Sequence, residues 1–173
     1  TSICLLAACG QAKGLFKKAF VFDSNLGAVY DTPAGARNLA ENLLKETQTP
    51  LYTLETGIPL NKLDMLGFSI GYELGITSAL NILELGNIPL LKSERTDEHP
   101  IIIAGGVGAT NPAVFSNFFD AVFIGEAEGG MFELINELAQ MKKNGATKTQ
   151  ILSKFASHPS VWTENMSEET CGH

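Results

Sequence analysis

The stretch Ile101-Ile102-Ile103-Ala104-Gly105-Gly106 decides the fold of this chain. Four aliphatic residues in succession are typical of a strand buried on both faces, and the two glycines end it abruptly. The same pattern occurs at 63–70, followed by Gly71, and at 121–124, followed by Gly125. Such strands are found mainly in parallel sheets that helices cover on either side. We expect these three segments to lie in such a sheet, with 121–124 as its last strand.

A helical pattern lies between the first two of these strands. Ile76, Leu80 and Leu83 share one face of a helix that we expect to run to about residue 85. Gly86 stands where a left-handed residue commonly ends a helix, and Pro89 prevents its continuation. The region after residue 86 therefore leads from a helix into the next strand.

The last third of the chain is predominantly helical in pattern. Asn111-Pro112 predicts the start of a short helix, and an amphipathic helix from 131 is expected to end at Asn144-Gly145. Thr147, with Gln150 three residues later, forms the capping box of one more helix. Alternating strands and helices predict the α/β class, as a Rossmann-like open parallel sheet with helices on both faces.

Weaker patterns precede residue 60. They predict a strand at 3–8 that opens the sheet, helical turns within 11–20, a short strand at 28–30, a helix at 33–46 and an edge strand at 51–54. We assign 1–160 to one domain. Residues 161–173 are assigned to a tail, whose Gly172-His173 we interpret as an expression boundary or the remnant of a purification tag.

Composition narrows the partners of the chain. A net charge of −7, with no basic run longer than the pairs Lys17-Lys18 and Lys142-Lys143, argues against nucleic acid as the main partner. No apolar run reaches the roughly 18 residues that span a bilayer, which predicts no membrane segment. Three cysteines form neither a disulfide framework nor a zinc ribbon, so we expect a cytoplasmic protein whose partners are small molecules or proteins.

Open parallel sheets bind ligands at the carboxyl ends of their strands, so the loops 9–14, 69–73, 105–110 and 125–128 are the candidate site. Glycines after a strand form a floor without side chains, and polar residues beside it can hydrogen-bond a ligand. The candidate cofactor-binding residues are Gln11, Gly14, Ser69, Tyr72, Gly105, Gly106, Gly108, Gly125 and Glu126. The alternative is that 9–14 is an ordinary turn, and that the acidic residues complement helix dipoles.

No residue is predicted to be catalytic or to bind a metal. His99, His158 and His173 lie in polar or terminal segments without a second ligand at metal-binding spacing. Cys9 could be a reactive thiol at a strand end or a small buried apolar residue. Any catalysis is therefore expected to need residues that this chain does not contain.

Several segments together carry a family resemblance. They are Gly67-Phe68-Ser69-Ile70-Gly71-Tyr72-Glu73-Leu74, Asn81-Ile82-Leu83-Glu84-Leu85-Gly86-Asn87-Ile88-Pro89-Leu90, Ile103-Ala104-Gly105-Gly106, Asn111-Pro112 and Phe118-Phe119-Asp120-Ala121-Val122-Phe123-Ile124-Gly125-Glu126-Ala127-Glu128. From Asp64 to about Ile151 the chain resembles the N-terminal domain that precedes the catalytic barrel in a family of cobalamin-domain radical SAM proteins, iron-sulfur oxidoreductases of uncertain function. The resemblance implies a cobalamin-binding fold, and as partner a barrel of the same polypeptide that binds a four-iron cluster and S-adenosylmethionine.

Two departures from the family pattern shape the functional expectation. The Cys-x3-Cys-x2-Cys run that holds the cluster is absent, so cluster and S-adenosylmethionine are expected only in the remainder of the protein. The cobalt-ligating pattern of related domains, Asp-x-His-x-x-Gly, corresponds to Cys9-x-Gln11-x-x-Gly14, which has no imidazole. We expect an accessory cobalamin-type domain that is not catalytic alone. The alternative is a degenerate scaffold that docks without a cofactor, and a nucleotide-binding enzyme ranks behind both because phosphate-cradling motifs are absent.

Overall fold

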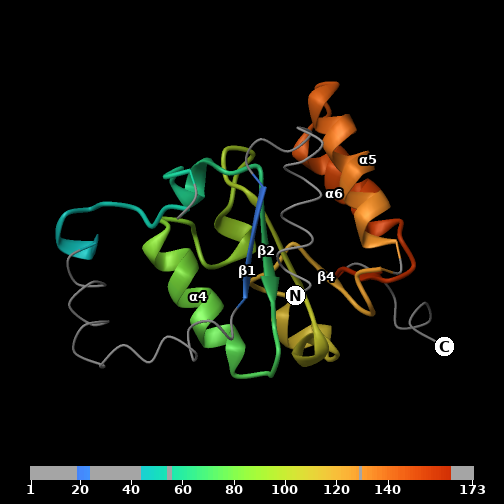
Figure 1. Ribbon diagram of the computed structural model, residues 1–173, viewed down its shortest axis with the longest axis horizontal. Coiled ribbons are helices and arrows are strands. Elements are labelled where there is room, and N and C mark those ends of the chain that lie inside the picture. Colours follow the sequence, from blue (N-terminus) through green and yellow to red (C-terminus); the bar gives the residue numbers. More distant parts are fainter. Residues whose placement is uncertain (1–18, 24–43, 54–55, 129, 165–173) are drawn as a thin grey trace.

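A five-stranded sheet forms the centre of the protein (Figure 1). The computed structural model describes residues 19–23, 44–53, 56–128 and 130–164. The strands follow one another across the sheet in sequence order: β1 (Ala19–Asp23), β2 (Met65–Ser69), β3 (Ile101–Gly105), β4 (Ala121–Phe123) and β5 (Val161–Trp162). The first four are parallel, and β5 pairs antiparallel with β4. The predicted α/β fold with an open, mostly parallel sheet is confirmed.

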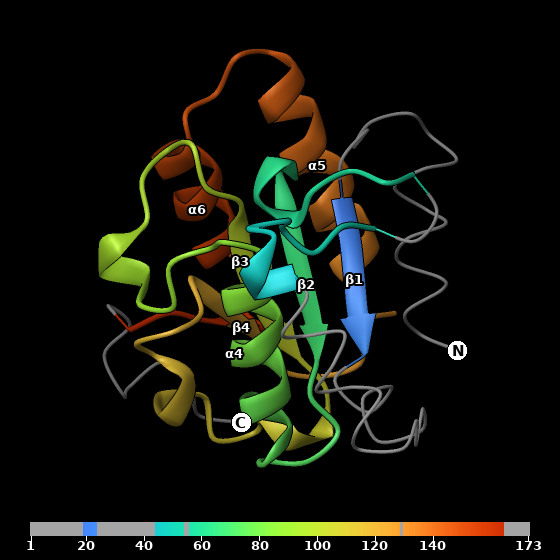
Figure 2. The same ribbon diagram turned by 90° about the vertical axis from the view of Figure 1, so that its left-hand side faces the viewer.

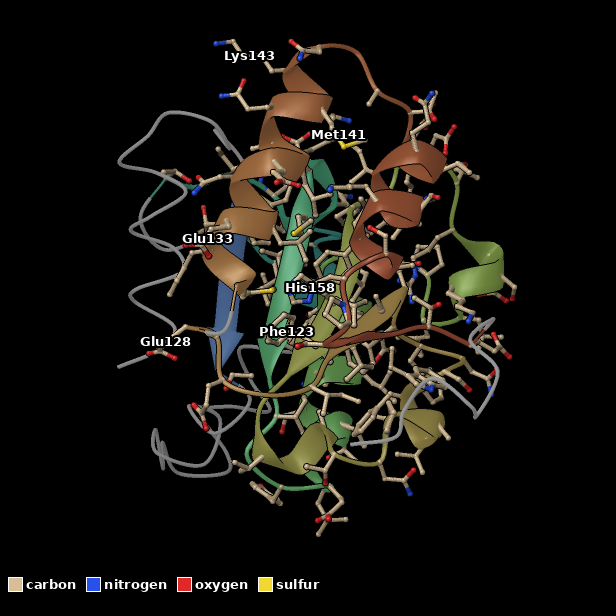
Figure 3. All side chains as sticks on the ribbon, turned by 90° about the vertical axis from the view of Figure 1, so that its right-hand side faces the viewer. Phe123, Glu128, Glu133, Met141, Lys143 and His158 are labelled. Carbon is tan, nitrogen blue, oxygen red and sulfur yellow. The ribbon has the colours of Figure 1, made fainter. Side chains whose placement is uncertain are left out.

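Helices cover both faces of this sheet (Figure 2). Helix α4 (Gly75–Leu85) packs on one face, whereas α5 (Met131–Lys143) and α6 (Lys148–Ala156) pack on the other, which Figure 3 shows from their side. Four short 3-10 helices lie in the connections: η1 (Leu60–Lys62), η2 (Lys92–Glu94), η3 (Val107–Ala109) and η4 (Pro112–Phe115).

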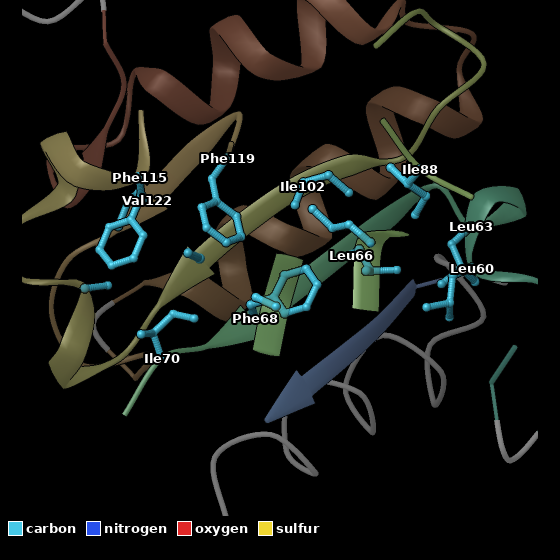
Figure 4. Close-up of a cluster of buried hydrophobic side chains, with 14 residues drawn as sticks. Leu60, Leu63, Leu66, Phe68, Ile70, Ile88, Ile102, Phe115, Phe119 and Val122 are labelled. Carbon is cyan, nitrogen blue, oxygen red and sulfur yellow. The ribbon is translucent and has the colours of Figure 1, made fainter. Parts of the chain in front are cut away.

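Two separate hydrophobic cores result from the alternation of side chains along the strands. In β2, Leu66 and Phe68 point into the core beneath α4 (Figure 4), whereas Met65 points into the core beneath α5 and α6. In β3, Ile102 likewise faces α4, while its neighbours Ile101 and Ile103 face the opposite layer. Because β2 and β3 are buried on both faces, successive residues along them must be apolar, as the aliphatic runs predicted.

The end of α4 differs in one residue from the prediction. Asn87, not Gly86, takes the left-handed conformation, with a φ of 54°. The amide of Ile88 donates to the Leu83 carbonyl at 2.9 Å and that of Asn87 to the Glu84 carbonyl at 3.0 Å, which is a Schellman motif. Gly86 has a φ of −79°, and a Cβ there would lie 3.1 Å from Leu60 Cβ. The role of Gly86 is therefore to let Leu60 pack closely against the end of α4, and not to adopt a left-handed conformation.

The last two helices begin and end as expected. Gly145 follows the C-cap of α5 with a φ of 85°. Glycine adopts this left-handed conformation at little energetic cost because it has no Cβ. The Thr147 side chain accepts from the Gln150 amide, and the Gln150 side chain accepts from the Thr147 amide at 2.9 Å. The predicted capping box is therefore confirmed.

Three sequence-based assignments of strands and turns were wrong. β1 includes Ala19 and Phe20, where helical turns were expected. The expected edge strand at 51–54 is reduced to a single bridge between Tyr52 and Pro59. β4 is not the last strand, because β5 follows it and brings residues assigned to the tail into the sheet. A two-residue strand has too little sequence to show a pattern. The predictions for 3–8, 11–18, 28–30, 33–43 and residue 54 lie outside the described residues.

Candidate functional site at the carboxyl edge of the sheet

Three of the predicted loops share one edge of the sheet. The loops 69–73, 105–110 and 125–128 follow β2, β3 and β4, which are adjacent and parallel, so all three leave the sheet on the same side (Figure 2). The fourth loop, 9–14, with Gln11 and Gly14, lies outside the described residues. This edge thus brings together the other predicted site residues.

The chain leaves β3 and β4 toward opposite faces of the sheet. After β3 it passes through η3 and η4, and Phe115 and Phe119 pack into the core beneath α4. After β4 it enters α5, whose Met131 and Leu134 belong to the opposite core. The strands keep their sequence order across the sheet, and the two connections leave its carboxyl edge on opposite faces. The carboxyl edge is where open α/β sheets bind ligands.

Backbone atoms of the neighbouring loop occupy the space where a Cβ of Gly106 or Gly108 would lie. A Cβ on Gly106 would lie 2.7 Å from the Ile70 carbonyl oxygen, and one on Gly108 would lie 2.5 Å from the Tyr72 amide nitrogen. Hydrogen bonds join the same segments, from the Ile70 amide to the Gly105 carbonyl at 2.7 Å and from the Gly108 amide to the Ile70 carbonyl at 2.8 Å. The two loops therefore form one interlocked unit.

The remaining predicted residues differ in their surroundings. Gly125 has a φ of 121° and open space where a Cβ would stand, so its conformation explains the glycine. A Cβ on Gly105 would lie 3.3 Å from the Phe123 carbonyl oxygen. Glu126 is exposed, and Ser69 is partly buried opposite Gly105 in the sheet register. Gly125 and Glu126 thus remain accessible at the carboxyl edge.

Exposed apolar side chains occur in the connections that follow β2 and β3. Tyr72 is 44% exposed and Leu74 71% in the first connection, and Val107 is 75% exposed and Val114 53% in the second. The charged residues in the three loops are Glu73, Glu126 and Glu128, with no lysine or arginine among them. The described part of the edge is therefore both apolar and acidic.

A buried ion pair, which no local pattern of residues predicted, holds the connections around β3 together. Arg95 and Asp120 have side chains only 1% and 8% exposed, and Arg95 Nη1 lies 3.1 Å from Asp120 Oδ2. Asp120 Oδ2 also accepts from the Ile102 amide at 2.7 Å. Burial lowers the pKa of Arg95, and the charge of Asp120 opposes that shift. The remaining guanidinium donors bond to the carbonyls of Pro89, Leu90 and Phe118.

A cavity of about 170 Å³ lies at the opposite, amino edge of the sheet, against η1, the loop 96–99 and the start of α6. Lys148 lines it and donates to the carbonyls of Thr96 and His99 at 3.2 Å, which tethers this loop to α6. Burial is the main cause that lowers the pKa of Lys148, and Asp120 opposes it. The charged lining is Lys62, Asp64, Asp97, Glu98, Lys142 and Lys148. Equal numbers of lysines and carboxylates give this cavity no preference for an anion or a cation.

The two described histidines have local structural partners. His158 lies against Phe123 with ring centroids 5.6 Å apart (Figure 3), and its Nδ1 accepts from the Ser160 amide at 3.2 Å. His99 Nδ1 accepts from the Thr96 amide at 3.0 Å. Within the described ranges, no group of three or more His, Cys, Asp or Glu side chains is placed to hold a metal ion. Nor does any helix in that part of the chain have the length and apolar character to cross a membrane.

These features define an open α/β domain with a candidate ligand site at the carboxyl edge of its sheet. The family model of the N-terminal domain of radical SAM proteins matches residues 36–163, which is most of the chain. The chain belongs to this family. No curated protein and no solved structure matches it significantly.

Family membership leads to a prediction about iron. The chain has Cys4, Cys9 and Cys171 but no closely spaced run of three cysteines. After anaerobic reconstitution with iron and sulfide, we expect no four-iron absorbance and no cleavage of S-adenosylmethionine, because the thiolate ligands are missing. A radical SAM protein that contains the run serves as positive control. A stoichiometric cluster on this chain would contradict the prediction.

Proposed function

We propose that this chain is an accessory, non-catalytic domain of a radical SAM protein that holds a cobalamin-type ligand at its carboxyl edge. The observation that carries the proposal is the divergence of the chain after β3 and β4 to opposite faces. Open α/β sheets bind ligands outside the carboxyl ends of their strands, and here two neighbouring connections leave that edge in opposite directions. Loop residues Gly105, Gly106, Gly125 and Glu126 flank this position.

The surroundings of the edge suit a large ligand with an apolar body. Tyr72 and Val107 offer exposed apolar surface in the loops after β2 and β3, and Gly125 is open on the side where a Cβ would stand. The exposed carboxylate of Glu126 can accept hydrogen bonds from amide groups of a ligand. Cobalamin, when bound, supplies a cobalt centre that can carry an alkyl group.

None of the three described loops at this edge contains a histidine. His99 lies at the amino edge, and the His158 ring packs against Phe123, with its Nδ1 accepting a hydrogen bond. Binding would therefore rest on apolar contact and on hydrogen bonds to the periphery of the ligand, without the metal bond that a histidine provides. We accordingly propose weak binding in the isolated domain.

Titration with hydroxocobalamin, followed by absorbance and calorimetry, tests this proposal. We expect a dissociation constant in the micromolar range or weaker and no spectral change from histidine ligation. Val107→Asp, which places a carboxylate on exposed surface beside Gly106, should weaken binding by about tenfold because the ligand would have to desolvate the new charge. Tyr52→Asp introduces the same charge at another exposed apolar residue, outside the three loops, and should leave binding unchanged. Tight binding that survives Val107→Asp would contradict the proposed position.

A second candidate is a docking domain that binds no cofactor. The specific observation in its favour is that the backbone of Ile70 and Tyr72 occupies the Cβ side of Gly106 and Gly108. Those glycines are then needed for packing between loops, whether or not a ligand is bound. Absence of hydroxocobalamin binding to both the unchanged chain and Tyr52→Asp would favour this candidate.

A further inference from the structure

The turn that ends α5 contains the one asparagine-glycine pair of the sequence, Asn144-Gly145. Both residues are exposed, and they follow Lys143 at the end of the helix (Figure 3). Every other asparagine precedes a residue that has a side chain. Asparagine before glycine is chemically labile, because no Cβ obstructs the approach to the glycine nitrogen. This turn therefore carries a reactive group that lies outside the candidate ligand edge.

The reaction open to this pair is deamidation. The Gly145 amide nitrogen attacks Cγ of Asn144, a five-membered succinimide ring forms, and Nδ2 takes up the amide proton and leaves as ammonia. Water then opens the ring at one of its two carbonyls and produces an aspartate or an isoaspartate. One side-chain amide and one water are thus converted into one carboxylic acid and one ammonia, and solvent water is the only co-reactant.

The folded structure holds the attacking nitrogen in a hydrogen bond. The Gly145 amide donates to the Lys142 carbonyl at 3.0 Å and the Ala146 amide to the Met141 carbonyl at 2.9 Å, which is a Schellman motif. The ψ of 6° at Asn144 places the Gly145 nitrogen on the side of the Asn144 backbone nitrogen, turned away from the side chain. Ring closure therefore requires the last turn of α5 to open and the backbone at Asn144 to rotate.

We propose that Asn144 is a site of spontaneous deamidation, and that opening of the last turn of α5 sets its rate in the folded protein. All residues from 142 to 145 are exposed, so this opening uncovers little apolar surface. Helix ends with few buried contacts open far more often than the whole molecule unfolds. The hydrogen bonds of the turn therefore slow the reaction in the folded chain without preventing it.

Neither product restores the original turn. Isoaspartate adds a carbon atom to the backbone, so the amides of Gly145 and Ala146 can no longer bond to Lys142 and Met141 in the same geometry. Aspartate keeps the backbone but places a negative charge beside the last carbonyls of α5, where the helix dipole is unfavourable for it. Both products therefore weaken the connection between α5 and α6.

Incubation of the folded chain at neutral pH, followed by peptide mass spectrometry and ion exchange, tests this proposal. We expect Asn144 to react faster than any other asparagine of the chain, and at least about tenfold faster in urea than in the folded state. Asn87 is the matched control, because it is also exposed and lies in the Schellman motif of α4. Its neighbour Ile88 has a branched side chain that hinders the attack, so Asn87 should react slowly in both states.

Two variants separate the chemistry from the opening of the turn. Asn144→Gln should remain unmodified, because its longer side chain would have to close a less favourable six-membered ring. Ala146→Pro removes the amide that donates to Met141, at a position where proline is common after a helix. It should speed the reaction in the folded chain and leave the rate in urea nearly unchanged. Thermal unfolding checks that both variants are folded.

The outcomes that overturn the proposal concern the unchanged chain, so they do not depend on the folding of a variant. One is an Asn144 that does not react in urea, or that reacts in urea but stays unmodified in the folded chain. Equal rates in the two states would show that the turn does not control the reaction. Faster reaction at another asparagine would place the labile site elsewhere. None of these measurements involves cobalamin, so the proposed function is tested separately.

Discussion

Arg95→Leu is expected to lower the free energy of unfolding by about 3–5 kcal/mol, because it leaves the buried carboxylate of Asp120 without its counter-charge. The Asp120 side chain is only 8% exposed, so water cannot replace the guanidinium. The carbonyls of Pro89, Leu90 and Phe118 lose their donor in the same exchange. Removing one partner from such a network costs more than the pair itself contributes, since unsatisfied buried groups remain.

Urea unfolding measures this effect against an exposed pair. Lys142→Leu removes the partner of Asp64, where the side chains are 49% and 31% exposed, and should cost no more than about 1 kcal/mol. Combining Arg95→Leu with Asp120→Leu should recover part of the loss, because no unpaired charge then remains buried. If Arg95→Leu lowers the free energy of unfolding no more than Lys142→Leu does, the buried ion pair is no more important for stability than the exposed one.

The second large effect is expected at Gly108. In Gly108→Ala the new Cβ would lie 2.5 to 2.7 Å from three backbone atoms of Tyr72, so the interlocked loops must separate. Such overpacking costs about 1–3 kcal/mol, and here backbone rather than a flexible side chain would have to move. Denaturant unfolding should show this loss, and Gly108→Ala should also weaken any binding at the carboxyl edge.

Gly57→Ala is the matched control for that exchange. Gly57 has a φ of 64° and nothing near the Cβ position, so alanine there meets only the cost of the left-handed conformation, about 1 kcal/mol. Gly108→Ala therefore measures the steric cost of a Cβ, and Gly57→Ala measures the cost of the left-handed conformation. If Gly108→Ala costs no more than Gly57→Ala, the close approach of the two loops is not needed for stability.

The elements that could be predicted from the sequence are those with a strong local pattern. The aliphatic run at 101–104 and the capping box at Thr147 need only neighbouring residues to be recognised, and both were found as expected. The pairing of Arg95 with Asp120 depends on how two connections meet across 25 residues of sequence, so the segment 92–99 showed only its polarity. The edge strand β5 is likewise set by pairing with β4, not by its own two residues.

The candidate site could be located but not fully interpreted from the sequence. The order of strands and glycines places Gly105, Gly106 and Gly125 at one edge, and the structure agrees. What fills the Cβ side of each glycine depends on the neighbouring loop, and Gly106 and Gly125 prove to be opposite cases. The exposure of Leu74 and Val107 could not be predicted either, because an apolar residue beside a strand is more often buried.

The direction of β5 determines the path length of whatever polypeptide continues beyond the sheet. Val161 pairs with Phe123 and Trp162 with Val122, so the chain there runs back from the carboxyl edge toward the amino edge. Glu164 is then held by an ion pair with Lys92 in η2. A strand of five residues is about 17 Å long, so any segment that leads from the end of β5 back to the carboxyl edge must contain at least about five extended residues.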